Sequence, residues 1–207
     1  GTVKDKHGRM IPDSEYTVTY VGADWINVGK HEVKIGNKSN GNYFISEKTQ
    51  EFEIFRTGQN PLSIMNQPTG KIYYGDTFTL TALGGSGTGT VEWESDNEAT
   101  ATIDGNGLVK ALGVGGPVTI KATRKGDGNY DDISVTWTFS AEKKVVTPTV
   151  TAMDREYKPD NTKADLVITW ESGALVDDDS IDLSGVLTGS FDNSDAGNNK
   201  RVTIQVN

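Results

Sequence analysis

The sequence of 207 residues contains no cysteine, which excludes disulfides, thiol nucleophiles and cysteine-ligated metals. It has two histidines, His7 and His31. Neither has an oriented partner or a third metal ligand that the sequence reveals, so we expect both on the solvated surface. No stretch approaches the roughly 18 consecutive apolar residues of a membrane span. We therefore expect no membrane-embedded segment within these residues.

Positive charge is also scarce, because 29 acidic and 20 basic residues give a formal net charge of −9. A negative surface disfavours binding to nucleic-acid phosphates and anionic lipids, and we expect no nucleic-acid partner. What the chain has in quantity is glycine, at 24 residues. Abundant glycine suits many short strands joined by tight turns.

Apolar residues recur with a period of two and nowhere with a sustained period of 3.6, which predicts an all-β protein. The clearest strand is Ile133–Ser140, where large apolar residues alternate with Ser or Thr. Such alternation is typical of a strand with one face on a core and one in water. The same pattern predicts strands at 16–20, 78–82, 91–93, 118–122 and 202–206, and a hairpin around the Gly and Asn residues of 104–107.

Two short motifs repeat along the chain. The tripeptide Gly-Asn-Tyr stands at 41–43 and 128–130, each time after a short alternating run and before a longer one. A glycine turn followed by a Val-x-Ile strand leads into Val33, Val118 and Val202, and we expect both branched side chains of each strand to face inward. Such repetition predicts serial copies of one supersecondary unit.

Composition divides the chain into three modules, at about 1–58, 59–143 and 144–207. We call them the first, middle and third modules. A turn-rich stretch opens the middle module and Ala141–Lys144 closes it. Because the linkers have only a few residues, we expect modules that abut end to end in an elongated array.

The middle module carries four motifs in a fixed order, and through them it resembles the bacterial immunoglobulin-like domain of group 2. These motifs are YGDTFTL at 74–80, VEWESDN at 91–97, ATID at 101–104 and GLV at 107–109. The resemblance implies a β-sandwich of the immunoglobulin type with no catalytic residues to carry over.

The outer modules resemble other repeats of bacterial surface proteins. The first, with segments 16–20, 27–29 and 41–43, is similar to MBG-type repeats. The third, with Tyr157 and segments 183–185 and 195–197, is similar to YDG-type repeats of large adhesins, although Lys158-Pro159 replaces the usual Asp-Gly. Together the resemblances imply tandem immunoglobulin-like sandwiches that are extracellular, at a bacterial cell surface.

Both outer modules depart from these patterns in length. The first lacks the usual opening strand, and the third lacks a Gly-Asn-Tyr segment and a final strand, so we expect both to be truncated. Truncated modules expose unpaired strand edges. We expect a monomer whose edges allow pairing with a neighbour.

Acidic turns are the candidate metal ligands. Ca²⁺ takes several loop oxygens, and three clusters could offer them: Asp177, Asp178 and Asp179; Asp192 with Asp195; and Asp127 with Asp131 and Asp132. None fits an EF-hand loop, and solvated turns explain all three as well. We therefore expect no cofactor, with calcium as the one exception that these clusters allow. A glycosidase pair would need two carboxylates at fixed separation in a cleft, which thin sandwiches rarely provide, so we assign no catalytic residue.

Aromatic residues are the candidate ligand-binding groups. Trp93, Trp137 and Trp170 fall on inward positions of alternating strands and are expected in cores. Trp25 stands in a loop-like segment, where it could stack on a sugar ring or plug a sandwich edge. We expect Tyr43 and Tyr130 to act structurally, through a hydroxyl hydrogen bond like that of a tyrosine corner.

Two functions remain open. The first is a non-catalytic stalk or adhesion region of a bacterial cell-surface protein, with an unknown protein or glycan as partner. The second is a set of glycan- or protein-binding accessory modules of a secreted carbohydrate-active enzyme. An exposed aromatic patch near Trp25 would favour the second, and uniformly polar faces the first.

Overall fold

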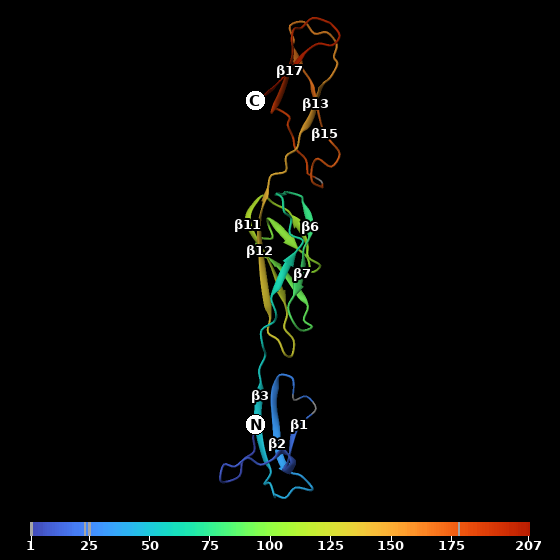
Figure 1. Cartoon of the computed structure of the whole chain (residues 1–207). Helices are drawn as coiled ribbons and strands as arrows, with labels where there is room; N and C mark the ends of the chain where they lie inside the picture. Colours follow the sequence, from blue (N-terminus) through green and yellow to red (C-terminus); the bar gives the residue numbers. More distant parts are fainter. Residues whose placement is uncertain (1, 23, 25, 178) are drawn as a thin grey trace.

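The structure, a computed structural model, describes residues 2–22, 24, 26–177 and 179–207. The chain is elongated, with the three modules in line from the N-terminal to the C-terminal one (Figure 1). Apart from one turn of 3-10 helix at Asp13–Glu15 (η1), the regular structure of the described residues consists of strands, which confirms the all-β fold class. The described part of the chain has no helix that is long and apolar enough to span a membrane.

The first module is built on one antiparallel sheet of order β1-β2-β3. Its strands are Tyr16–Val21 (β1), Gly29–Asn37 (β2) and Lys48–Ile54 (β3). The register places Val18 opposite Ile35, so the alternating residues put Tyr16, Val18, Ile35 and Phe52 on one face. Val18 is nevertheless 49% exposed, because the described strands of this module form a single layer.

The middle module contains two facing layers of sheet (Figure 1). One layer has the order β5-β12-β11-β8, and the other holds the sheet β6-β10-β9 and the pair β4-β7. The strands are Leu62–Met65 (β4), Ile72–Tyr73 (β5), Thr77–Thr79 (β6), Thr81–Gly84 (β7), Val91–Ser95 (β8), Ala101–Ile103 (β9), Leu108–Ala111 (β10), Gly115–Arg124 (β11) and Ile133–Glu142 (β12).

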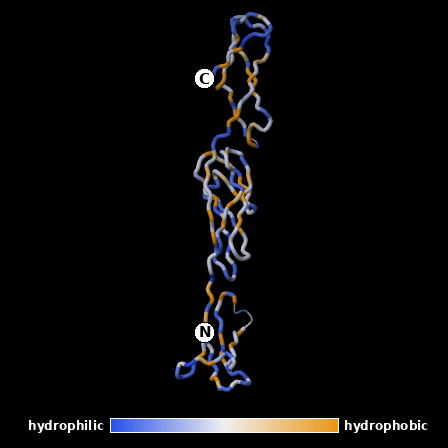
Figure 2. Tube along the Cα trace, in the orientation of Figure 1, coloured by the Kyte–Doolittle hydropathy of each residue, from blue (hydrophilic) through white to orange (hydrophobic). Residues whose placement is uncertain are grey.

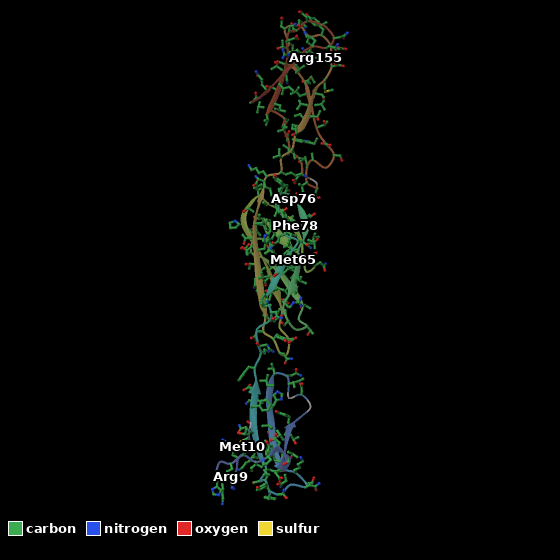
Figure 3. All side chains as sticks on the ribbon, in the orientation of Figure 1. Arg9, Met10, Met65, Asp76, Phe78 and Arg155 are labelled. Atoms are coloured by element: carbon green, nitrogen blue, oxygen red, sulfur yellow. The ribbon has the colours of Figure 1, made fainter. Side chains whose placement is uncertain are left out.

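The two layers close over an apolar core. Ile120 from one layer and Val109 from the other are both 0% exposed. Phe78 of β6 lies in the centre of the module (Figure 3). Its ring meets those of Trp137 and Phe139 edge to face, with centroids 5.9 and 6.0 Å apart, a favoured aromatic geometry. Trp93 and Trp137 are partly buried and pack against this core, which confirms their expected positions.

The strand predicted at 78–82 is in fact two strands. β6 pairs with β10, whereas β7 pairs with β4, so the chain changes sheets at Leu80. Leu80 is 1% exposed, and its amide donates to the carbonyl of Gly107. The hairpin predicted at 104–107 is confirmed by the pairing of β9 with β10, and within its turn Gly107 has a positive φ of 82°.

The third module has two small sheets, β13-β15 and β14-β16-β17. Its strands are Pro148–Ala152 (β13), Lys163–Ala164 (β14), Leu166–Trp170 (β15), Leu187–Phe191 (β16) and Val202–Val206 (β17). Near its outer end the Arg155 guanidinium lies 5.1 Å from the centre of the Phe191 ring (Figure 3). Apolar and polar residues alternate along this thin module (Figure 2), and Ile204 remains 43% exposed.

The repeated motifs mark equivalent strands. In both the first and the middle module, the strand after the glycine turn pairs with the strand after Gly-Asn-Tyr, as β2 with β3 and β11 with β12. A third strand joins the other edge of the first of these, β1 in one module and β8 in the other. The inward Val-x-Ile prediction holds fully for Val118 and Ile120 alone.

Candidate functional site: the junctions between modules

The β11–β12 hairpin ends in a loop that faces the first module. Asp127 organises this loop, since its carboxylate accepts the amides of Asn129 at 2.8 Å and Tyr130 at 3.2 Å, and that of Thr88 at 3.0 Å. These bonds, led by that of Asn129, lower the pKa of Asp127 from its ordinary value. Asp132 likewise accepts the amide of Gly126, which lowers its pKa. The carboxylates thus hold the loop in one conformation.

Asn129 uses this position to bind the first module. Its side-chain oxygen accepts the amide of Val28 at 2.9 Å, and its side-chain nitrogen donates to the side-chain oxygen of Asn27, also at 2.9 Å. His31 contacts the same turn, with its ring nitrogen 2.7 Å from the carbonyl of Asn27. One amide side chain therefore clamps the end of the first module through a donor and an acceptor.

The connecting segment is tied into the same place. The amide of Thr57 donates to the carbonyl of Asn129 at 3.1 Å, and the amide of Asp131 donates to the carbonyl of Thr57 at 3.0 Å. These bonds form a parallel bridge between Thr57 and Tyr130. The linker is therefore part of the sheet edge and has little freedom to act as a hinge.

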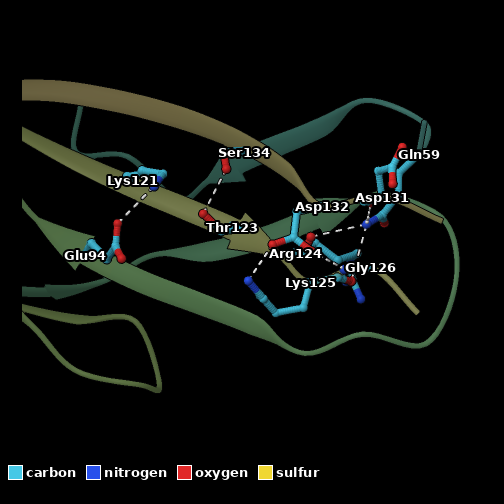
Figure 4. A network of polar contacts seen from close by, with 10 residues as sticks. All are labelled: Gln59, Glu94, Lys121, Thr123, Arg124, Lys125, Gly126, Asp131, Asp132 and Ser134. Carbon is cyan, nitrogen blue, oxygen red and sulfur yellow. Dashed lines mark hydrogen bonds and ion pairs between the residues drawn. The ribbon is translucent and has the colours of Figure 1, made fainter. Parts of the chain in front are cut away.

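Gln59, which follows the linker, holds this segment against the loop end of the β11–β12 hairpin (Figure 4). Its side-chain nitrogen donates to the carbonyl of Asp131 at 2.7 Å and also approaches that of Arg124 at 3.2 Å. The amide of Ser86 donates to its side-chain oxygen at 3.0 Å. On the outer face of the same layer, Lys121 pairs with Glu94, and Lys125 pairs with Asp132. Hydrogen bonds and ion pairs thus brace the part of the middle module that lies beside the junction.

The junction between the middle and third modules is built differently. The Asp179 carboxylate, which interacts with the hydroxyl of Tyr74, raises the pKa of Tyr74. A Cβ at Gly75 would lie 2.3 Å from a methyl group of Val176, so only glycine admits this approach. Lys144 also reaches the carbonyl of Gly173 at 3.4 Å. This contact depends on close packing of a loop against a turn.

The predicted calcium ligands take separate places. Asp179 interacts with Tyr74 at the junction between the middle and third modules, Asp177 is an exposed loop residue, and Asp178 lies outside the described residues. At the second cluster the Lys200 ammonium lies 3.4 Å from the Asp192 carboxylate and 2.9 Å from the carbonyl of Asp195. Within the described ranges no three His, Asp or Glu side chains form a group that could hold a metal.

The other candidate residues are distributed as follows. Trp25 lies outside the described residues, so its role as a ligand-binding residue remains a prediction. His7 is exposed as expected, but His31 is half-buried and packs on Phe52, which corrects its expected place on the surface. The backbone of Tyr130 takes part in the junction through its bridge with Thr57 and its amide bond to Asp127, and the hydroxyl bond predicted for Tyr43 and Tyr130 remains a prediction.

Sequence reasoning missed the roles of Asn27, Asn129 and Gln59. The repeated tripeptide marked the Asn129 loop, but it drew attention to the tyrosine and not to the asparagine before it. Nothing in the sequence around Gln59 distinguishes it from an ordinary exposed glutamine. Asn129 lies about a hundred positions from its partners in the first module, and Gln59 is 72 positions from Asp131. Such separations are not visible to a local pattern.

Comparisons with known proteins bear on the middle module. Residues 73–133 match the family model of the bacterial Ig-like domain (group 2). No curated protein matches the chain. Among solved structures, surface layer protein SbsC, domains 4–9, is 18% identical, with all of this chain and 37% of that one covered, at a TM-score of 0.26. The chain thus spans well under half of that solved chain, and a TM-score of this size does not show a common fold. The match over residues 73–133 confirms that the middle module resembles the bacterial Ig-like domain of group 2.

Proposed function

We propose that the chain is a non-catalytic, extracellular stalk region of a bacterial cell-surface protein. Its modules, at 1–58, 59–143 and 144–207, act in series to set the distance and direction of whatever they carry. The observation that supports this most is the clamp of Asn129 on Asn27 and Val28. A flexible string of domains would not need such a contact, whereas a stalk of defined direction does.

Two features favour a mechanical role over a chemical one. Polar contacts join the first and middle modules and brace the hairpin beside this junction, and the family that the middle module matches is a bacterial Ig-like domain. The expected cell-surface location and the unknown protein or glycan partner belong to this proposal.

The stalk proposal is tested by distances between modules. The chain has no cysteine, so Lys48→Cys and Lys110→Cys give two unique sites for spin labels in the first and middle modules. We expect a narrow distribution of label distances in the otherwise unchanged chain and a broader one in Asn129→Ala. Asn106→Ala, in a hairpin turn of the same module, is the matched control and should leave the distribution narrow. A broad distribution before any change at Asn129 would contradict the stalk.

One observation favours a second candidate, ligand binding at the outer end of the first module. Tyr43 and Phe44, in the β2–β3 loop, are 58% and 89% exposed. Neighbouring exposed aromatic residues suit contact with a sugar ring or an apolar protein surface. A glycan array probed with the chain and with Phe44→Ala tests this. Binding lost in the variant would support it, and equal signals or none would reject it.

A further inference from the structure

The outer end of the third module contains a cavity of about 520 Å³. Two segments line it, at 152–157 after β13 and at 193–200 between β16 and β17, together with Phe191 and Val202. Arg155, labelled in Figure 3, marks this end of the molecule. Small-molecule sites in proteins have volumes of about 300–1,000 Å³. The cavity is therefore of the right size for a small ligand.

The loop between β16 and β17 is held in place by Lys200. Its ammonium donates to the carbonyls of Asn193 and Asp195, both at 2.9 Å, and to the side-chain oxygen of Asn193. It also lies 3.4 Å from the Asp192 carboxylate, and the Lys200 side chain is only 16% exposed. An ammonium has three N–H donors, so these acceptors use all of them. Lys200 thus positions the loop and leaves ligand contacts to other residues.

Arg155 lines another side of the cavity and has an unpaired donor. Its guanidinium lies 5.1 Å from the centre of the Phe191 ring, and its Nη2 donates to the carbonyl of Asn161. The other terminal nitrogen, Nη1, is buried and has no hydrogen-bond partner among the described residues. Buried donors in folded proteins are almost always paired. A ligand oxygen in the adjoining cavity would supply the acceptor that the chain does not.

The exposed residues around the cavity carry both donors and acceptors. Asp154 and Asp195 offer carboxylate oxygens, and Asn198 offers an amide group. An anionic ligand would meet these carboxylates as like charges. Over the described ranges no three His, Cys, Asp or Glu side chains form a group that could hold a metal ion. A ligand rich in hydroxyl groups, which donate and accept at once, suits this mixed lining better.

An aromatic ring narrows the class of ligand. Tyr157 lines the same cavity and is 61% exposed. An exposed aromatic face packs well on the apolar face of a sugar ring, while the polar groups nearby bond the hydroxyl groups at its rim. An aromatic ring, an unpaired donor and exposed carboxylates thus occur around one cavity of suitable size.

We propose that this cavity binds a neutral saccharide. The sugar ring lies against Tyr157, one of its oxygens accepts from Nη1 of Arg155, and its hydroxyl groups donate to carboxylates of the lining. With few such contacts the binding is weak, with a Kd near 1 mM. This site is separate from Tyr43 and Phe44, which lie in the first module. It also stands apart from the proposed stalk, because either one holds if the other fails.

The test is an NMR titration of the full chain with glucose, galactose, mannose and N-acetylglucosamine. Each sugar is added up to about 50 mM, a range that covers a Kd near 1 mM. We expect at least one of them to shift amide signals within 153–157 and 193–200 and to reach saturation. Tyr157→Ala should raise the Kd by about tenfold through loss of the stacked ring. Arg155→Lys keeps the charge but loses the planar set of donors, and should raise the Kd by about tenfold or more.

Two control variants should keep the Kd of the unchanged chain. Arg201→Lys makes the same chemical change at an exposed arginine of the same module that does not line the cavity. Phe44→Ala removes an exposed aromatic residue of the first module. Because Tyr157 is exposed, its replacement leaves the fold intact, so the test does not depend on how well Arg155→Lys folds.

Three results would overturn the proposal. The first is that none of the four sugars shifts the signals of 153–157 and 193–200. The second is a Kd that neither Tyr157→Ala nor Arg155→Lys changes, because the sugar would then lie elsewhere. The third is binding of glucuronate or galacturonate alone, which would assign the cavity to an anionic ligand.

Discussion

The first and middle modules use the same three strands in the same order and differ in what covers them. In the middle module the face of β11 and β12 lies under a second layer, and Ile120 is fully buried. In the first module the corresponding face belongs to a single sheet, and Val18 is half exposed. Alternation in sequence therefore produces the strands in both modules, but a core only where a second layer exists.

This difference separates the source of secondary structure from the source of stability. Burial of apolar surface supplies most of the favourable free energy of folding. The first module buries little, so more of its order must come from its contacts with the middle module. The Asn129 clamp is then both a geometric device and a support for the weaker module.

The largest expected difference lies at equivalent isoleucines of the three modules. Ile120→Ala should lower the free energy of unfolding of the middle module by about 3–4 kcal/mol, since it opens a cavity in a closed core. Ile35→Ala, at a half-buried position, should cost about 1–2 kcal/mol, and Ile204→Ala less than about 1 kcal/mol. Urea unfolding followed by amide signals of each module measures all three. Equal losses would show that the first module has cover that its sheet does not reveal.

A smaller effect is expected from the turn that joins β9 to β10. Gly107→Ala should destabilise the middle module by more than about 1 kcal/mol, because φ is 82° and a Cβ would lie 2.3 Å from the carbonyl oxygen of Leu80. Gly105→Ala, two residues earlier in the turn, meets no atom within 4 Å and is the matched control. Thermal unfolding of the two variants makes the comparison. Equal melting temperatures would mean that the turn relaxes around the added methyl group.

Next in size is a hydrogen bond that joins the two layers of the middle module. The hydroxyl of Ser95 on β8 donates to the carbonyl of Ala101 on β9 at 2.7 Å. Ser95→Ala should cost about 1 kcal/mol. Thr17→Ala in the first module removes a longer bond, of 3.3 Å, within a single sheet, and should have almost no effect. A loss at Thr17 as large as that at Ser95 would remove the distinction between the layered and the single sheet.

Much of this architecture could be predicted from the sequence, for a physical reason. Period-two alternation sets which residues face a core, so β1, β8, β11, β12 and β17 all begin within three residues of the predicted positions. The change of sheet at Leu80 was not predictable, since an unbroken alternating run looks the same whether it stays in one sheet or crosses to another. At this point the Leu80 amide donates to the carbonyl of Gly107, a contact that the local pattern does not show.

The candidate site was less predictable than the fold. Asn129 and Asn27 are ordinary turn residues, and their contact exists only because the modules stack end to end. The acidic turns show the reverse error: Asp192 and Asp195 suggest a cation site, but the cation beside them is the ammonium of Lys200. A local pattern does not reveal which basic side chain folds back onto an acidic turn.

The smallest expected effect on stability concerns the junction loop at low pH. Backbone amides hold the pKa of Asp127 below its ordinary value of 3.8, so its contribution is complete above that value and is lost as the pH falls through the lowered pKa. Protonation should release the amides of Asn129 and Thr88, loosening the loop that carries the clamp. The measurement is the pH dependence of these two amide signals in NMR spectra, with a midpoint expected below 3.8. In Asp127→Asn the shared transition should vanish while the fold of the middle module remains. If the transition persists in this variant, its cause is protonation of another group, such as Asp132. The link between Asp127 and the first module would then be unsupported.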